Sequence, residues 1–95
     1  MTQAQALRRD DRVEMNPMYL FRWEESQQAH VLLYPEGVVK LNPTAGAILE
    51  RCTGDMTVGE MIDDLAGRYV DGDVADGVLK FLEVSHAKGW IRRKP

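Results

Sequence analysis

The sequence predicts a small α+β domain of the winged helix-turn-helix type, in which an N-terminal three-stranded antiparallel sheet is followed by three helices. Residues 19–24 alternate with a period of two and residues 29–34 form a near-continuous apolar run, and both patterns are typical of strands. Apolar positions recur at helical spacing in much of residues 43–89. The 95 residues suffice for a single hydrophobic core, so we expect one domain over residues 18–95. Residues 1–17 are polar and aperiodic and are expected to form a flexible arm.

Three short strands are predicted in the N-terminal half. Tyr19, Phe21 and Trp23 alternate with other residues in the first, which spans residues 18–24. The near-continuous apolar run at 29–34 predicts a central second strand. Residues 35–37, Pro-Glu-Gly, predict a three-residue hairpin loop closed by a left-handed Gly37. The third strand is Val38–Leu41, which makes the sheet a meander.

Three helices are expected to follow. Asn42 and Pro43 give the first helix an N-cap and a first-position proline, and Gly54 is its expected stop. Thr57 and Glu60 have the spacing of a capping box, which predicts the start of the second helix. The third helix is expected to begin after an Asp71-Gly72 turn with Asp73 as its cap and to end near Gly89, before a short extended piece at Trp90-Ile91.

The apolar faces of these elements predict the core. Its expected members are Tyr19, Trp23, Val31, Leu33, Val39, Leu41, Ile48, Leu49, Ile62, Leu65, Val78 and Leu82. Cys52 is expected to be a small buried thiol on the first helix, because the sequence offers no neighbouring base that would make it a nucleophile.

The sequence carries no recognisable enzyme motif. Neither a dinucleotide-binding glycine pattern nor a phosphate-binding loop occurs, and His30 and His86 lack cysteines at metal-ligand spacing. No apolar stretch is long enough to span a bilayer, and the N-terminus has no apolar signal region. We therefore expect a cytoplasmic protein that is not an enzyme and needs no metal or cofactor.

Charge argues against nucleic acid as the partner of the predicted helix-turn-helix. The third helix and its approach carry four acids against two bases: Asp71, Asp73, Asp76, Glu83, Lys80 and Lys88. Phosphates would be repelled by such a face. Bases without acids gather only in the tail, at Lys88, Arg92, Arg93 and Lys94, where they form either a solubilising terminus or a rim that docks an acidic partner.

Two features point to a peptide partner. The backbone groups along one edge of the strand Val38–Leu41 face no predicted neighbour, and proteins either blunt such edges or use them to bind an extended peptide. The apolar arc of the third helix covers roughly 220°, more than one packed face requires. Either the helix is buried on two sides, or the flank with Gly77, Phe81 and Val84 lines a groove.

Three segments together resemble the pyrroloquinoline quinone biosynthesis protein D (PqqD) family. They are "LLYPEGVVKLNPTAGAILERCTG", "TVGEMIDDLAGRY" and "VLKFLEVSHAKGW". The resemblance implies the fold called the RiPP recognition element and the role of a peptide chaperone. Such a chaperone binds a precursor peptide (PqqA-like) and presents it to a radical S-adenosylmethionine enzyme (PqqE-like), which joins a glutamate and a tyrosine of the peptide.

The resemblance also implies a binding site. The peptide would add as a strand along Val38, Val39, Lys40 and Leu41 and pack against Gly77, Phe81 and Val84. Family members often have an aspartate where this chain has Gly77, so a polar contact made by that aspartate is absent or shifted.

Two other functions stay open, namely a recognition element for a different modified peptide and a nucleic-acid-binding module. The open edge also permits either a monomer or a homodimer formed by strand exchange.

Overall fold

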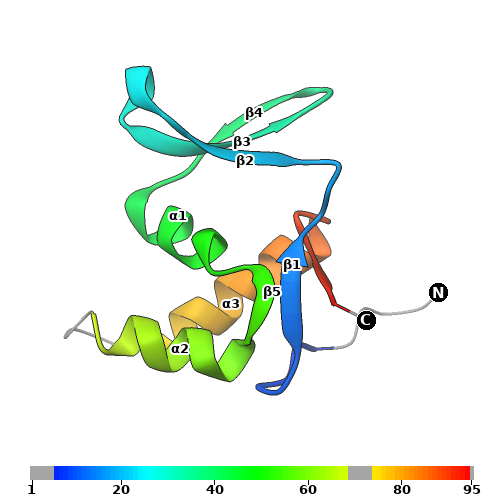
Figure 1. Ribbon diagram of the computed structural model, residues 1–95, viewed down its shortest axis with the longest axis vertical. Helices are drawn as coiled ribbons and strands as arrows, with labels where there is room; N and C mark the ends of the chain where they lie inside the picture. Colours follow the sequence, from blue (N-terminus) through cyan, green and yellow to red (C-terminus); the bar gives the residue numbers. More distant parts are fainter. Residues whose placement is uncertain (1–5, 69–73, 95) are drawn as a thin grey trace.

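The structure is a computed structural model that describes residues 6–68 and 74–94. Its elements are β1 (Arg12–Met15), β2 (Leu20–Glu24), the 3-10 turn η1 (Glu25–Gln27), β3 (Ala29–Tyr34), β4 (Gly37–Lys40), α1 (Pro43–Glu50), β5 (Thr53–Thr57), α2 (Val58–Ala66), α3 (Val74–Ala87) and β6 (Ile91–Arg93). The strands form two three-stranded sheets, ordered β2-β3-β4 and β5-β1-β6. Figure 1 shows the first sheet beside α1 and the second beside α3. The predicted α+β class, with an antiparallel meander followed by three helices, is confirmed.

The β2-β3-β4 sheet is the predicted meander with β3 in its centre. Both strand pairs are antiparallel and in regular register, with Phe21 opposite Leu32 and Leu32 opposite Val39. The connection between β3 and β4 is tighter than expected, because Tyr34 pairs directly with Gly37 and only two residues form the turn. Gly37 is not among the residues with positive φ, so the prediction of a left-handed glycine closing a bulged three-residue loop is wrong.

The predicted flexible arm does not extend over residues 12–15. These residues form β1, the central strand of the second sheet, which pairs with β5 on one side and β6 on the other. Val13 is fully buried there, and Leu7 lies in the same core. The strand was missed because β1 has only four residues and alternates charged with apolar side chains, so its pairing depends on segments remote in sequence.

The first helix ends earlier than predicted. Asn42 caps its start by accepting a hydrogen bond from the Ala45 amide at 2.7 Å, as expected, but α1 stops at Glu50. Gly54 therefore does not terminate a helix. It adopts a φ of 88° inside β5, a strand that the sequence did not predict.

The second and third helices follow the predicted pattern where they are described. Thr57 and Glu60 form the reciprocal capping box, with the Glu60 amide donating to Thr57 Oγ1 at 3.1 Å and the Thr57 amide donating to Glu60 Oε1 at 2.8 Å. Gly89 ends the α3 segment with a φ of 82°. The predicted Asp71-Gly72 turn and Asp73 cap lie outside the described residues. No described helix has the length and apolar character needed to cross a membrane.

The hydrophobic core lies between the helices, β1 and the inner face of the β2-β3-β4 sheet. Seven predicted members are buried there: Leu41, Ile48, Leu49, Ile62, Leu65, Val78 and Leu82. Val31, also predicted, is buried as well, but it lies on the outer face of the sheet between Arg22 and Lys40. The prediction that Trp23 belongs to the core is wrong, because 48% of this residue is exposed to solvent. In β3 the fully buried leucine of the core is Leu32, whereas Leu33 is only partly buried, since Leu33 points to the opposite face of the sheet.

Helix α1 approaches β3 closely at one point. The His30 ring stacks on Phe21 with centroids 4.9 Å apart, and its Nε2 lies 3.6 Å from Glu50 Oε2. A Cβ placed on Gly46 would come within 2.7 Å of His30 Nδ1, so only glycine fits this contact without a shift. This contact of His30 with Gly46 and Glu50, called the joint below, holds α1 against the meander and so positions the end of β4.

Candidate functional site: an open strand edge beside an apolar pocket

Strand β4 presents two sets of backbone groups to the outside. The Leu41 amide donates to the His30 carbonyl at 3.0 Å, and bonded pairs alternate along an antiparallel ladder. The amide and carbonyl of Val39 therefore face β3, while those of Val38 and Lys40 face away from it. Within the described part of the chain no strand pairs with this side of β4.

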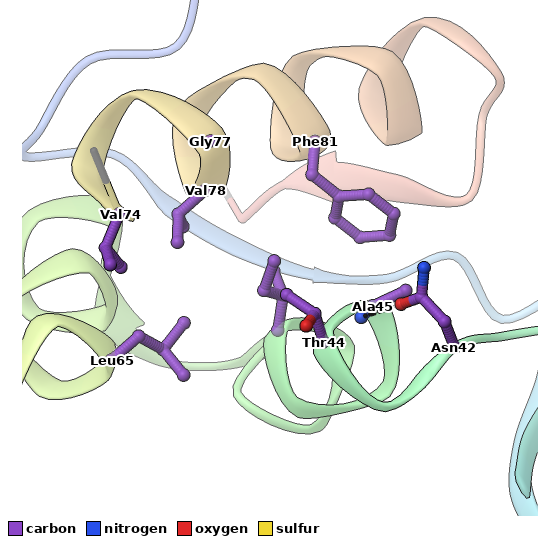
Figure 2. Close-up of a pocket in the computed structure, with 9 residues that line it drawn as sticks. Asn42, Thr44, Ala45, Leu65, Val74, Gly77, Val78 and Phe81 are labelled. Carbon is purple, nitrogen blue, oxygen red and sulfur yellow. Dashed lines mark hydrogen bonds between the residues drawn. The ribbon is translucent and has the colours of Figure 1, made fainter. Parts of the chain in front are cut away.

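An apolar pocket of about 430 Å³ lies between α1 and α3, with α2 at one end. Among the described residues, those that line it are Asn42, Thr44, Ala45, Ile48, Leu65, Val74, Gly77, Val78 and Phe81. Figure 2 shows Val78 and Phe81 of α3 on the side that faces α1, with the Phe81 ring near Asn42, and Val74 above Leu65 of α2. Because Asn42 lies only two residues beyond the end of β4, the open edge and the pocket are adjacent.

The structure brings two of the three predicted helix residues into this pocket. Gly77 and Phe81 line it, and a Cβ built on Gly77 would meet nothing within 4 Å. Space therefore exists for another molecule's backbone to approach Gly77. Val84 is half exposed one turn further along α3 and is not a lining residue. The four strand residues form the open edge and its end rather than the pocket wall.

Sequence reasoning missed the contributions of α1 and α2 to the pocket. Ile48 and Leu65 were predicted only as core residues, and Asn42 only as a helix cap. A signal was present in Asn42, because a cap that directly follows an edge strand must lie where that strand meets the first helix. The separation of α1 from α3, which opens the pocket, is a tertiary feature that periodicity does not encode.

The described lining of the pocket is apolar or uncharged. None of the described residues that line it has a titratable side chain. Burial raises the pKa of the Cys52 thiol to about 12, so this group is protonated at neutral pH and is a poor nucleophile. No group of three or more His, Cys, Asp or Glu residues suited to a metal ion occurs in the described part of the chain. The arrangement can hold an extended, partly apolar chain.

Charge on α3 remains unfavourable for phosphate. Asp76 lies in the first turn of the helix and forms an ion pair with Lys80 at 3.2 Å. The basic tail is also engaged within the chain: Arg92 pairs with Glu14 at 2.8 Å, and Lys88 lies 5.7 Å from the centre of the Trp90 ring. These contacts support a structural role for the tail.

A small winged α+β fold with an open strand edge beside an apolar pocket defines a peptide-recognition module. The family model described as "Coenzyme PQQ synthesis protein D (PqqD)" matches residues 29–91, and the chain belongs to this family.

Curated relatives and a solved structure agree with this assignment. The chain is 40% identical to the "PqqA binding protein" of Methylococcus capsulatus over 92% of its own length and 94% of that protein. It is 45% identical to the "PqqA binding protein" of Azotobacter vinelandii over 77% of its length and 80% of that protein. It also matches the solution structure of the PqqD truncation of Methylobacterium extorquens PqqCD, described as a functional and stand-alone RiPP recognition element. That match has a TM-score of 0.72 and 27% identity, and it covers 93% of this chain and 96% of the other.

The fold occurs in a more distant protein as well. The heterocyclase TruD matches with a TM-score of 0.68 at 18% identity over 88% of this chain and 12% of TruD. At that identity the likeness concerns the fold alone.

Proposed function

We propose that this protein binds the precursor peptide of pyrroloquinoline quinone (a PqqA-like peptide) as an added strand on β4 and presents it to a radical S-adenosylmethionine enzyme. The observation that carries the proposal is the adjacency of the outward-facing backbone of Val38 and Lys40 to the apolar pocket. Relatives of the chain are named for binding PqqA, which supports the choice of peptide.

Affinity and specificity would come from different parts of the site. The backbone of β4 would pair with any extended chain, so this contact contributes affinity with little dependence on sequence. Alternate side chains of an added strand would point toward the inner face of the sheet and, beyond the strand end, toward Phe81 and Gly77. We infer that apolar peptide residues entering the pocket there determine which peptide is bound.

The proposed role is non-catalytic and cytoplasmic. The described residues that line the pocket include no acid, base or nucleophile, and in this proposal the partner enzyme performs the covalent chemistry. The unpaired, buried Cys52 agrees with a reducing compartment.

Two substitutions on α3 test the pocket. Phe81→Ala removes the ring at its mouth, and Gly77→Val places a branched side chain in space that is empty in the structure. Each variant should stay folded and bind the peptide at least tenfold more weakly by isothermal titration calorimetry, equivalent to about 1.4 kcal/mol. Ala75→Val is the matched control, because Ala75 is an exposed residue on the same turn that does not line the pocket.

Salt dependence distinguishes the proposal from nucleic-acid binding. A protein that neutralises several phosphates loses affinity steeply as salt rises, whereas strand addition into an apolar pocket depends on salt weakly. A peptide affinity that changes less than about threefold between 50 and 200 mM salt supports the proposal. Peptide affinity unchanged in both pocket variants would overturn the assignment of the pocket.

A further inference from the structure

The outer face of the β2-β3-β4 sheet carries an exposed apolar row. The register places Leu20 opposite Leu33, and Leu33 opposite Val38, so the three side chains lie side by side across the sheet. Leu20 is 54% exposed and Val38 is 59% exposed. Phe21, Leu32 and Val39, on the opposite face, belong to or pack against the core. Leu20, Leu33 and Val38 therefore do not pack against the hydrophobic core.

A basic row borders these apolar side chains. Arg22 is opposite Val31, and Val31 is opposite Lys40, two residues along each strand from the apolar row. Arg22 lies 3.2 Å from Glu24, but both of these side chains remain partly exposed. Among the described residues no ion pair involves Lys40. Glu24 shares this face with Arg22 and balances its charge, so Lys40, on the strand with the open edge, gives the face its positive charge in a chain whose net charge is −3.

The area of this outer face indicates whether it could hold a stable dimer or only a transient partner. Three strands about 4.8 Å apart and about five residues long, at ~3.3 Å per residue, give a face of roughly 240 Å². A stable interface buries about 800 Å² on each partner. The face alone is therefore too small to hold a second copy of this chain permanently.

The open edge of β4 offers a way to enlarge the face. A strand added along β4 would extend the sheet by about 4.8 Å, and every second side chain of that strand would point to the outer face beside Val38. A partner that contacts the face would then meet the domain and its bound peptide together, and would bind the loaded form more tightly than the empty one.

We propose that the outer face formed by Leu20, Leu33 and Val38 docks the enzyme that modifies the bound peptide, through an apolar patch edged by carboxylates on that enzyme. This inference rests on the proposed function, because the enzyme and the peptide are those named there. It adds the surface, the complementary chemistry and the preference for the loaded chaperone.

Leu20→Glu is the test substitution, because Leu20 lies on β2, about 10 Å from β4, and its exposed side chain can be replaced without disturbing the core. Leu20→Ile is the matched control, which keeps the face apolar. Affinity for the purified radical S-adenosylmethionine enzyme is measured by biolayer interferometry with and without saturating peptide, and affinity for the peptide is measured separately.

The proposal predicts that peptide tightens enzyme binding by the unchanged protein, and that Leu20→Glu weakens enzyme binding at least tenfold. Peptide affinity should stay within twofold in both variants, and Leu20→Ile should bind the enzyme normally. Enzyme affinity unchanged in Leu20→Glu overturns the docking face. A dimer in sedimentation velocity that Leu20→Glu dissociates also overturns it, in favour of a second copy. If the unchanged protein binds no peptide, the proposed function itself fails.

Discussion

The two sheets of this small domain have opposite organisation. The β5-β1-β6 sheet brings together segments from both ends of the chain. Ion pairs link its segments, between Arg92 and Glu14 and between Arg93 and Asp11, the latter at 3.0 Å. The β2-β3-β4 sheet is built from consecutive hairpins and leaves an edge and an apolar face exposed. Figure 1 shows the β5-β1-β6 sheet beside α3 and the β2-β3-β4 sheet above α1.

This difference separates stability from binding. The closed sheet and the helices hold most of the core, including Val13, Ile91 and the buried side of α2. The open sheet contributes one face to that core, and within residues 6–68 and 74–94 no strand pairs with its β4 edge. Substitutions in the first region should therefore act on folding, and those on the open sheet should act on ligand binding.

The largest expected effect is on the core of the first region. Leu49 in α1 is 1% exposed, and Leu49→Ala should lower the free energy of unfolding by about 2–5 kcal/mol. Leu20→Ala on the open sheet should cost less than about 1 kcal/mol because that side chain is half exposed. Urea unfolding followed by circular dichroism measures both, and equal losses would break the comparison.

The joint between the two regions should be sensitive to a single methyl group. Gly46→Ala would place a Cβ 2.7 Å from His30 Nδ1 and should cost about 1–3 kcal/mol by overpacking. Gly77→Ala is the matched control, because its Cβ would have open space in a helix, and it should raise stability by about 0.5–1 kcal/mol. Thermal unfolding measures both. A neutral Gly46→Ala would mean that α1 can move away from β3 freely.

Proline distinguishes the two sides of β4. The Val39 amide faces β3, so Val39→Pro should leave a β3 carbonyl unpaired and lower stability by about 1–3 kcal/mol. The Lys40 amide faces the open edge, so Lys40→Pro should keep the fold and weaken peptide binding at least tenfold. Unfolding and peptide titration are measured on both variants. A Lys40→Pro variant that binds peptide normally would argue against strand addition.

The smallest effect concerns pH and the closed sheet. The Arg8 amide donates to Asp11 at 2.8 Å, and this hydrogen bond, with help from Arg93, lowers the pKa of the Asp11 carboxyl below its usual 3.8. A lowered folded-state pKa stabilises the protein above pH 3.8, and this stability is lost as pH falls through the folded-state value. Because Asp11 and Arg93 are partly exposed, the contribution should not exceed about 1 kcal/mol. Asp11→Asn should flatten the stability profile between pH 6 and pH 3 by that amount.

The sequence predicted the open sheet better than the closed one for a physical reason. β2, β3 and β4 are adjacent in sequence, so apolar patterning and the turn residues between them mark the three strands locally, although the β3-β4 turn has two residues rather than the predicted three. β1 and β5 are short, carry polar side chains and gain stability only from each other and from β6, which is remote in the chain. Periodicity does not register such pairings.

The candidate site likewise has a part that local sequence patterns predicted and a part that depends on tertiary packing. The edge strand and the Gly77 and Phe81 flank of α3 followed from local patterns. The α1 side of the pocket, with Thr44 and Ile48, depends on how far α1 and α3 stand apart, which the packing of α2 and the joint at His30 decide. That the backbone amide of Lys40, and not that of Val39, faces the open edge could be determined only from the hydrogen-bond register of β3 and β4.

The most direct test of strand addition on β4 is amide hydrogen exchange by NMR, with and without the precursor peptide. In the free protein the Val39 amide should already be protected, whereas those of Val38 and Lys40 should exchange rapidly at the open edge. Saturating peptide should slow exchange at Val38 and Lys40 at least tenfold and leave Val39 little changed. Unaltered exchange at Val38 and Lys40 in the peptide-saturated protein, or new protection confined to β2 or α2, would contradict the account.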